Sequence, residues 1–143
     1  MEGFFQSYLR LYRLIITSLN ELLSIYKLSY SLWQVIFHIK NNGPSTLVDI
    51  AKQYNVEKPT ITRRVHRLEE LQIVKQIVGQ DRREKIIQLT ELGEELYKAC
   101  RKEITDLEVK IMEGITREEQ EVISHILPKI QENIINKEGN KIE

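Results

Sequence analysis

The sequence predicts a mainly α-helical protein with a small β-hairpin, and three observations indicate this class. Apolar residues recur at three- and four-residue intervals through most of the chain, which is the period of amphipathic helices. Two short β-branched runs, residues 73–78 and 85–89, interrupt that period. The length of 143 residues suffices for one domain with a real core, so two independent domains are not expected.

Composition and cysteine content predict a soluble, cytoplasmic protein without membrane contact. Charged residues make up 29% and apolar residues 41% of the chain, and no apolar run approaches the roughly 20 residues that span a bilayer. The apolar N-terminus suggests a signal peptide, but Glu2 replaces its basic leader, and Asn20 and Glu21 stand where small residues would precede cleavage. The single cysteine, Cys100, fits a reducing compartment.

Three helices are expected before the basic region. Residues 5–26 carry one apolar stripe, and residues 32–39 carry a second, which the Asn-Gly-Pro of residues 42–44 terminates. A third, very short helix is expected to begin at an N-cap formed by Ser45 or Thr46 and to end after about two turns.

The next helix, within residues 57–72, is expected to have a basic outer face. Pro59 suits its first turn. Its inward positions recur at three and four residues: Ile61, Val65, Leu68 and Leu71. The other side carries hydrogen-bonding and basic side chains: Thr60, Thr62, Arg63, His66 and Arg67.

The two β-branched runs predict a hairpin with a loop of about six residues. Its tip holds five consecutive charged residues, Asp81 to Lys85. Beyond it, an apolar stripe from Leu92 to Ile111 predicts a helix of about 24 residues, or roughly 36 Å. Thr116 and Glu119 then form a capping box that opens a last helix, and residues 136–143 are expected to be a polar tail.

Charge is unevenly distributed although the formal net charge is zero. Residues 52–85 hold nine basic and five acidic side chains, a surplus of four, and the compensating acidic excess falls mainly after residue 86. An asymmetry of this kind can focus a phosphate backbone onto one face of a protein.

A short helix, a tight turn, a basic second helix and a hairpin follow one another in the order typical of a winged helix-turn-helix, whose second helix enters the major groove of DNA. Residues 45–93 also resemble the DNA-binding core of the MarR (multiple antibiotic resistance regulator) family of bacterial repressors. The most specific part is Asp81-x-Arg83 followed by Leu89-Thr90-x-x-Gly93.

By layout, the resemblance covers essentially the whole chain, because the family also has an N-terminal helix and two C-terminal helices that interlock two subunits. It implies a single domain over residues 1–143 with a winged helix-turn-helix core at residues 32–93. The N- and C-terminal dimerisation helices would then lie at residues 1–28 and 94–137.

For the hairpin tip, the resemblance implies that Arg83 enters the minor groove and that Asp81 orients it. A narrow A·T-rich minor groove concentrates negative potential, and a guanidinium fits it as a fork. Arg82 and Lys85 would then contact phosphates.

The remaining candidate DNA contacts come from the two preceding helices. Those expected on base edges are Thr60, Thr62 and Arg63. Those expected on phosphates are Lys58, Arg67 and, at a helix N-terminus, Ser45 or Thr46. The alternative is that this basic face is only a solvated helix surface.

Two residues depart from the family pattern. Gln72 stands where the family usually has the glycine that ends the second helix, so a left-handed C-cap there is more costly. Glu57 stands where it often has a serine cap, which places a carboxylate near the DNA.

Redox and metal sites are not expected. Cysteine sensors among similar proteins lie in the N-terminal helix, whereas Cys100 falls on the stripe of Leu96 and Ile104, as a buried small hydrophobe does. The three histidines share no metal-ligand spacing, so neither a metal nor another cofactor is expected.

The first two helices carry aromatic residues where relatives often form an effector pocket against the long C-terminal helix. The candidates for a pocket that takes a small apolar or phenolic ligand are Tyr12, Tyr26, Tyr30, Trp33 and His38. The alternative is that these side chains only fill the core.

The sequence therefore favours a homodimeric DNA-binding transcriptional regulator, a repressor that binds a pseudo-palindromic operator and is released by a small ligand. The alternative is a winged-helix protein-interaction module without sequence-specific DNA binding, because a fold does not dictate its partner. An enzyme is not expected, because the chain has no glycine-rich phosphate loop, nucleophile elbow or clustered triad.

Overall fold

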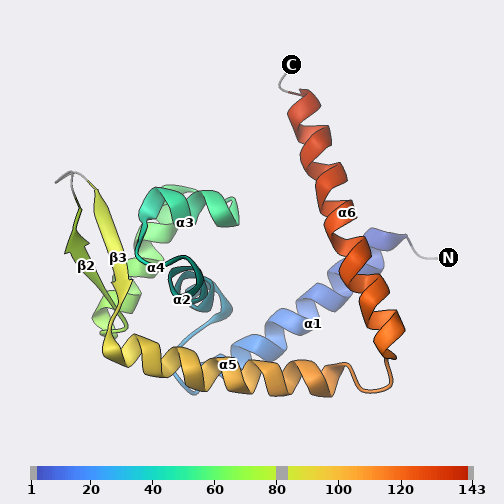
Figure 1. Cartoon of the computed structure of the whole chain (residues 1–143), viewed down its shortest axis with the longest axis horizontal. Coiled ribbons are helices and arrows are strands. Elements are labelled where there is room, and N and C mark those ends of the chain that lie inside the picture. The colour runs from blue at the N-terminus through green and yellow to red at the C-terminus, as the bar shows by residue number, and fades with distance from the viewer. Residues whose placement is uncertain (1–2, 80–83, 142–143) are drawn as a thin grey trace. The chain divides into compact units, whose positions relative to one another are not determined.

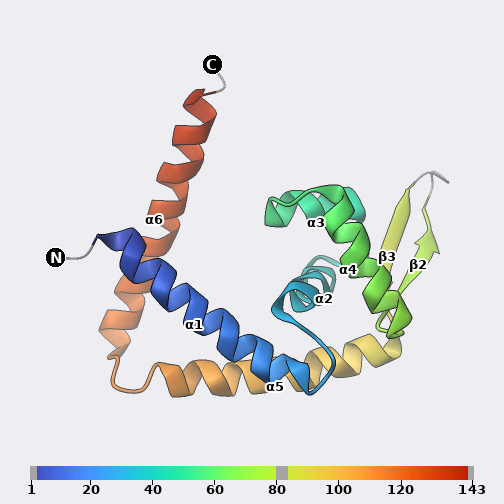
Figure 2. The same cartoon turned by 180° about the vertical axis from the view of Figure 1, so that it is seen from behind.

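The computed structural model describes residues 3–79 and 84–141, with side chains up to residue 137. It is mostly helical with a small antiparallel sheet (Figures 1 and 2). The elements in chain order are α1 (Phe4–Ser24), α2 (Tyr30–Asn42), β1 (Ser45–Thr46), α3 (Leu47–Tyr54), α4 (Lys58–Glu70), β2 (Val74–Val78), β3 (Lys85–Leu89), α5 (Glu91–Ile111) and α6 (Arg117–Lys141). The chain divides into two compact units, Met1–Asp106 and Leu107–Glu143.

Side-chain caps fix the starts of the short helices. The Ser29 hydroxyl accepts a hydrogen bond from the Leu32 N–H at 3.3 Å where α2 begins. The Thr46 hydroxyl accepts one from the Asp49 N–H at 3.1 Å where α3 begins. Of the two residues expected to cap α3, Thr46 is therefore the cap.

The sheet has three strands in the order β1-β3-β2, all antiparallel. The expected hairpin is confirmed: Val74 pairs with Leu89, Val78 pairs with Lys85, and six residues connect the strands. The third strand, β1, was not predicted, and Ser45 at its start pairs with Ile87. Two residues are too few to show the alternation by which a strand is recognised in a sequence.

The core of the first unit forms where α2, α3 and α4 pack against one another and against the sheet. Of the four inward positions expected for α4, Ile61, Val65 and Leu68 are buried, and Leu71, just after the helix, is half-buried against the same core. They share this core with Ile36 of α2 and Ile87 of β3. Burying a side chain of this size stabilises a fold by about 1.5–3 kcal/mol, so the packing fixes which face of α4 points outward.

A tight junction joins α4, the sheet and α5. Gln72 has φ 61, which is the left-handed conformation expected there, and the Ile73 N–H donates to the Leu68 carbonyl oxygen at 2.9 Å. The Thr90 hydroxyl donates to the Gln72 carbonyl oxygen at 2.6 Å and accepts from the Gly93 N–H at 3.0 Å. A Cβ atom on Gly93 would lie 2.2 Å from the Ile73 carbonyl oxygen, so the end of the Leu-Thr-x-x-Gly motif must be glycine.

The two last helices differ in length from their predictions. α5 has 21 residues, and the capping box of α6 is confirmed by hydrogen bonds between Thr116 and Glu119 at 3.0 and 3.1 Å. α6 continues to Lys141. A polar tail was expected from residue 136, but the backbone of residues 136–141 is helical. One glycine in a helix costs only about 1 kcal/mol and does not end it. No described helix is long and apolar enough to cross a membrane.

Candidate nucleic-acid interface

The outer face of α4 presents the side chains that the sequence placed there. Thr62, Arg63, His66 and Arg67 are exposed, and Thr60 is half-buried. The Arg63 guanidinium donates to the Thr60 hydroxyl at 3.5 Å, and the Thr62 hydroxyl donates to the Lys58 carbonyl oxygen at 3.0 Å. Within residues 3–79 and 84–137, no acidic side chain forms an ion pair with Arg63.

Two other arginines of α4 have partners within the first unit. Arg64 donates to the Gln34 side-chain oxygen at 3.3 Å, which ties α4 to α2. Arg67 forms an ion pair with Glu70 at 3.0 Å, and His66 lies 3.1 Å from the other oxygen of the same carboxylate. These exposed pairs are weak, so Arg67 can exchange Glu70 for a phosphate at little cost.

A hollow of about 560 Å³ gathers candidate residues from three elements. Thr46 comes from the start of α3, Lys58 and Thr62 come from the first turns of α4, and Lys85 comes from the start of β3. The four side chains are far apart in sequence but line one surface. Its walls hold two ammonium groups and two hydroxyl groups, which are donors suited to phosphate oxygens. They also hold the carboxylates of Asp49 and Glu84.

The other four lining residues of this hollow were not among the candidates from the sequence: Leu47, Val48, Asp49 and Glu84. Asp49 stands three residues after the Thr46 cap, where an acidic residue is common in a first helical turn, so its position could have been predicted. Nothing in the sequence indicated that Glu84 would lie near α3, because that proximity depends on how the sheet packs against the helices.

Ser45 does not line this hollow. Ser45 is buried, and its hydroxyl donates to the Gly43 carbonyl oxygen at 2.8 Å, so of the two phosphate-binding candidates at this turn only Thr46 reaches the surface. Asp81, Arg82 and Arg83 lie outside the described residues, and their roles stay predictions.

The five aromatic and histidine candidates for an effector pocket are dispersed. Trp33 is buried and stacks on Tyr97 of α5 at 5.4 Å. His38 is also buried and meets the edge of Tyr54 at 6.1 Å, whereas Tyr12 is 47% exposed on α1 and stacks on Tyr8. Core packing therefore accounts for Trp33 and His38.

Tyr26 and Tyr30 lie at the turn between α1 and α2. The Tyr30 N–H donates to the Asn20 side-chain oxygen at 2.7 Å. A hydrogen bond with Glu103 of α5 raises the pKa of Tyr26, with burial as a smaller cause. One carboxylate oxygen of Glu103 is buried without a hydrogen-bond partner among the described atoms.

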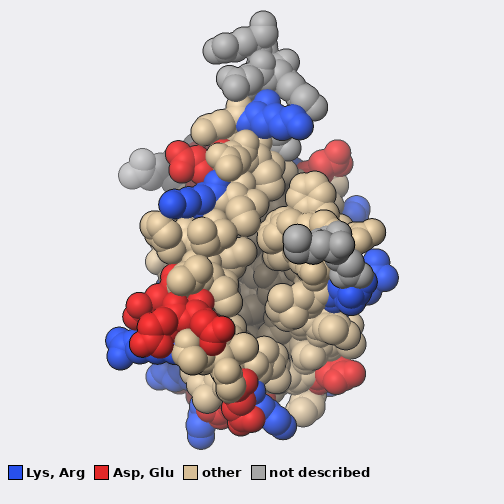
Figure 3. All heavy atoms as spheres, turned by 90° about the vertical axis from the view of Figure 1, so that its right-hand side faces the viewer, with Lys and Arg blue, Asp and Glu red and all other residues tan. Residues whose placement is uncertain are grey.

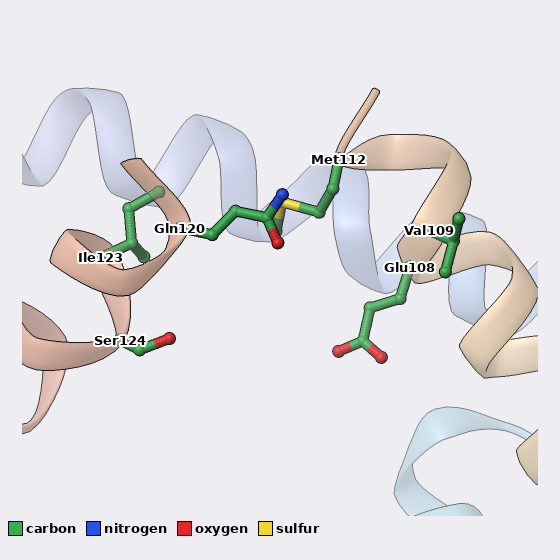
Figure 4. A pocket seen from close by; sticks show the side chains of 6 residues that line it. All are labelled: Glu108, Val109, Met112, Gln120, Ile123 and Ser124. Atoms are coloured by element: carbon green, nitrogen blue, oxygen red, sulfur yellow. The ribbon is translucent and has the colours of Figure 1, made fainter. Parts of the chain in front are cut away.

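The second unit contains a hollow of its own, of about 530 Å³, between the end of α5 and the start of α6. In Figure 4 the side chains of Met112 and Gln120 point toward one another across this corner. The other lining residues are Glu108, Val109, Ile123 and Ser124. None of the five predicted effector residues belongs to it.

Cys100 is buried as predicted, with no exposed surface. Burial raises the pKa of its thiol to about 11, and the nearby Glu103 adds to the effect. A thiol with this pKa is almost entirely protonated near neutral pH, and the thiolate is the reactive form.

Comparison with known proteins identifies the chain's relatives. A model of the MarR family matches residues 28–85. The uncharacterized HTH-type transcriptional regulator YwoH of Bacillus subtilis is 35% identical over 114 residues, which are 80% of this chain and 83% of that protein.

Solved structures show the same fold. Staphylococcus aureus MarR in complex with salicylate and kanamycin has a TM-score of 0.84 at 24% identity, over 93% of this chain and 91% of that chain. The S. aureus MepR-DNA complex has a TM-score of 0.85 at 20% identity, over 94% of this chain and 99% of that one. These relatives are regulators of transcription and not enzymes. The chain belongs to the MarR family of helix-turn-helix transcriptional regulators.

Proposed function

We propose that this regulator binds a pseudo-palindromic DNA operator as a homodimer, with α4 in the major groove and the β2–β3 hairpin at the minor groove. The observation that carries the proposal is the hollow in which Thr46, Lys58, Thr62 and Lys85 meet beside the exposed side of α4. At such a surface, contacts with phosphates hold a helix in place on the DNA. Contacts between the helix and base edges then provide the sequence preference.

The proposal assigns separate tasks to the candidate residues. Thr60, Thr62 and Arg63 read base edges, and Lys58, Lys85 and Arg67 bind phosphates. Arg83 enters the minor groove with Asp81 orienting it, and Arg82 contacts phosphate. S. aureus MepR, which has the same fold, has been solved as a DNA complex, and this supports DNA as the partner.

The proposed dimer rests on unpartnered apolar surface on two helices. The exposed large apolar residues of α1 are Phe4, Phe5, Tyr8, Leu9, Leu11, Tyr12 and Leu14. Those of α6 are Val122, Ile123, Ile126, Leu127, Ile134 and Ile135. Figure 3 shows uncharged side chains over much of the face that it draws. Monomeric proteins rarely leave so many large apolar side chains in water, so residues 1–28 and 94–137 are assigned to dimerisation.

The regulator is further proposed to act as a repressor that a small apolar or phenolic ligand releases from DNA. S. aureus MarR, which shares the fold, has been solved with salicylate and kanamycin. Tyr26 and Trp33 provide a physical route for such a response, because each contacts α5 from the α1–α2 region. A ligand that displaced these contacts would favour a different position of α5.

The test begins with footprinting on the DNA upstream of the protein's own gene, followed by titrations at several salt concentrations. Arg63→Ala should weaken binding by about 1–3 kcal/mol and flatten the base preference at one position in each half-site. Arg83→Ala should weaken binding most on operators with A·T-rich flanks and remove the preference for those flanks. Asp81→Ala should have a smaller effect of the same kind, since it leaves the arginine in place.

Two results would contradict the assignment. If Arg83→Ala distinguishes A·T-rich from G·C-rich flanks as the parent does, the hairpin does not read the minor groove. If the parent protects no DNA sequence at all, the basic face serves the alternative role of a protein-interaction module.

A further inference from the structure

A free carboxylate stands at the start of the helix that carries the basic outer face. Glu57 is the N-cap of α4, and its exposed side chain makes no capping hydrogen bond. The turn before it is fixed, because Asn55 has φ 51 and the Val56 N–H donates to the Ala51 carbonyl oxygen at 3.0 Å. Among the described residues, no cationic side chain lies within 4.0 Å of the Glu57 carboxylate. The Glu57 carboxylate therefore has neither a capping hydrogen bond nor an ion pair within the described residues.

Glu57 lies at the end of α4 where two of the candidate base contacts begin. Thr60 and Arg63 are three residues apart within the helix and so lie on one side of it, and Glu57 precedes Thr60 by three residues as the N-cap. Arg63 donates to the Thr60 hydroxyl at 3.5 Å, which holds the guanidinium toward the N-terminal half of this face. Six residues rise about 9 Å along a helix, so Glu57 and Arg63 would meet different base pairs.

The chemistry of a carboxylate selects one base. An ionised carboxylate only accepts hydrogen bonds. In the major groove, cytosine presents an N4 amino donor, whereas guanine presents the acceptors O6 and N7, and thymine presents the acceptor O4. Adenine has an amino donor, but the acceptor N7 stands beside it. The second carboxylate oxygen would face this N7, and two acceptors repel one another. Cytosine is therefore the base edge that a carboxylate at this position favours.

We propose that Glu57 is a specificity-determining residue that accepts a hydrogen bond from a cytosine N4 amino group once in each half-site. The inference rests on the proposed function, since it requires α4 to lie in the major groove. If so, two side chains of opposite charge, Glu57 and Arg63, contact bases from the start of α4. Glu57 selects cytosine, and Arg63 carries the two-pronged donor that suits guanine.

The experiment uses the full-length protein and a pool of operators with every half-site position randomised. The parent, Glu57→Gln and Glu84→Gln are each used to select bound sequences, and the selected positions are then titrated individually. Glu57→Gln should lose the preference for cytosine at one position of each half-site and gain one for adenine, whose N6 and N7 a glutamine amide can bind together. The change in relative affinity should be about 5- to 100-fold at that position.

Glu84→Gln is the matched control, because it removes the same charge from the rim of the hollow formed with α3 and α4. It should raise affinity for all sequences by a similar factor and leave each base preference unchanged. If Glu57→Gln behaves in the same way, Glu57 acts only through its charge and the inference is overturned, while the proposed function stands. If the parent itself selects no sequence, the proposed function and the inference fall together.

Discussion

Gln72 has a backbone conformation that glycine adopts at lower cost. Its φ of 61 lies in the left-handed region, where a side chain costs roughly 1–2 kcal/mol, partly offset by the greater unfolded-state entropy of glycine. Gln72→Gly should therefore raise the free energy of unfolding by up to about 1 kcal/mol. Denaturant titration of Gln72→Gly beside Gln53→Gly provides the check, because Gln53 is an exposed residue inside α3 and its substitution should lower stability by about 1 kcal/mol. Equal losses in both variants would contradict the strain at Gln72.

Cys100 should make stability depend on pH in the alkaline range. Burial raises the pKa of its thiol from 9.0 to about 11, so the folded state holds the proton after the unfolded state has released it. This contribution is fully present below pH 9 and is lost as the pH rises toward 11. Two pKa units correspond to about 2–3 kcal/mol.

The measurement for Cys100 is chemical denaturation of the parent and Cys100→Ala at intervals between pH 8 and 11. The parent should lose more stability than the variant over this range, by an amount of the order just given. Parallel curves would mean that the thiol ionises equally well in the folded and unfolded states.

At the scale of single residues, the sequence predicted orientation better than accessibility. Ile61, Val65 and Leu68 were assigned inward because the helical period defines a face, and all three are buried. Ser45 was one of two alternatives, with Thr46, for the helix cap and its phosphate contact, because serine and threonine both suit a helix start. The two-residue strand β1 instead buries Ser45 beside β3, and that pairing depends on residues some 40 positions later in the sequence.

At the scale of elements, the junction between the sheet and α5 leaves no room for a larger side chain at Gly93. Gly93→Ala would place a methyl carbon 2.2 Å from the backbone oxygen of Ile73. Because a backbone atom cannot rotate aside, this substitution should destabilise the protein by about 1–3 kcal/mol or more. Thermal unfolding measures the effect. Gly3→Ala is the control, since a Cβ on Gly3 meets nothing within 4 Å, and a comparable loss in that variant would remove the packing explanation.

Elements with many periodic residues were predicted well from the sequence, and short or terminal elements were not. α4 and the hairpin have the expected bounds within a few residues because buried apolar side chains repeat along them. The end of α6 was predicted too early, since a polar composition says little about whether a helix that has already formed continues. The hollow beside α4 joins α3, α4 and β3, and no local pattern predicts such a meeting.

At the scale of the whole molecule, the apolar residues of α1 predict a dimer that a single charge can weaken. Leu14 is 63% exposed, and Leu14→Glu would place a carboxylate in an interface that excludes water, where an unpaired charge is costly. Sedimentation should give twice the chain mass for the parent and a larger monomer fraction for this variant.

Val78→Glu is the control for the dimer, because Val78 is 88% exposed at the end of β2 and is not among the residues assigned to dimerisation. It should sediment as the parent does. A parent that stays monomeric at micromolar concentration, or equal dissociation of both variants, would exclude α1 as an interface helix.

The contacts of Thr90 connect α5 to α4 and the sheet, which carry the proposed DNA-binding surface. Its hydroxyl holds the end of α4 through Gln72 and the first turn of α5 through Gly93, and its own N–H donates to Ile73 just before β2. A helix of 21 residues is about 31 Å long. Pivoting it by about 6° displaces its far end by roughly 3 Å, close to the 3.4 Å rise of one base pair. A rotation of α5 by a few degrees would therefore shift its far end by about the distance between neighbouring base pairs.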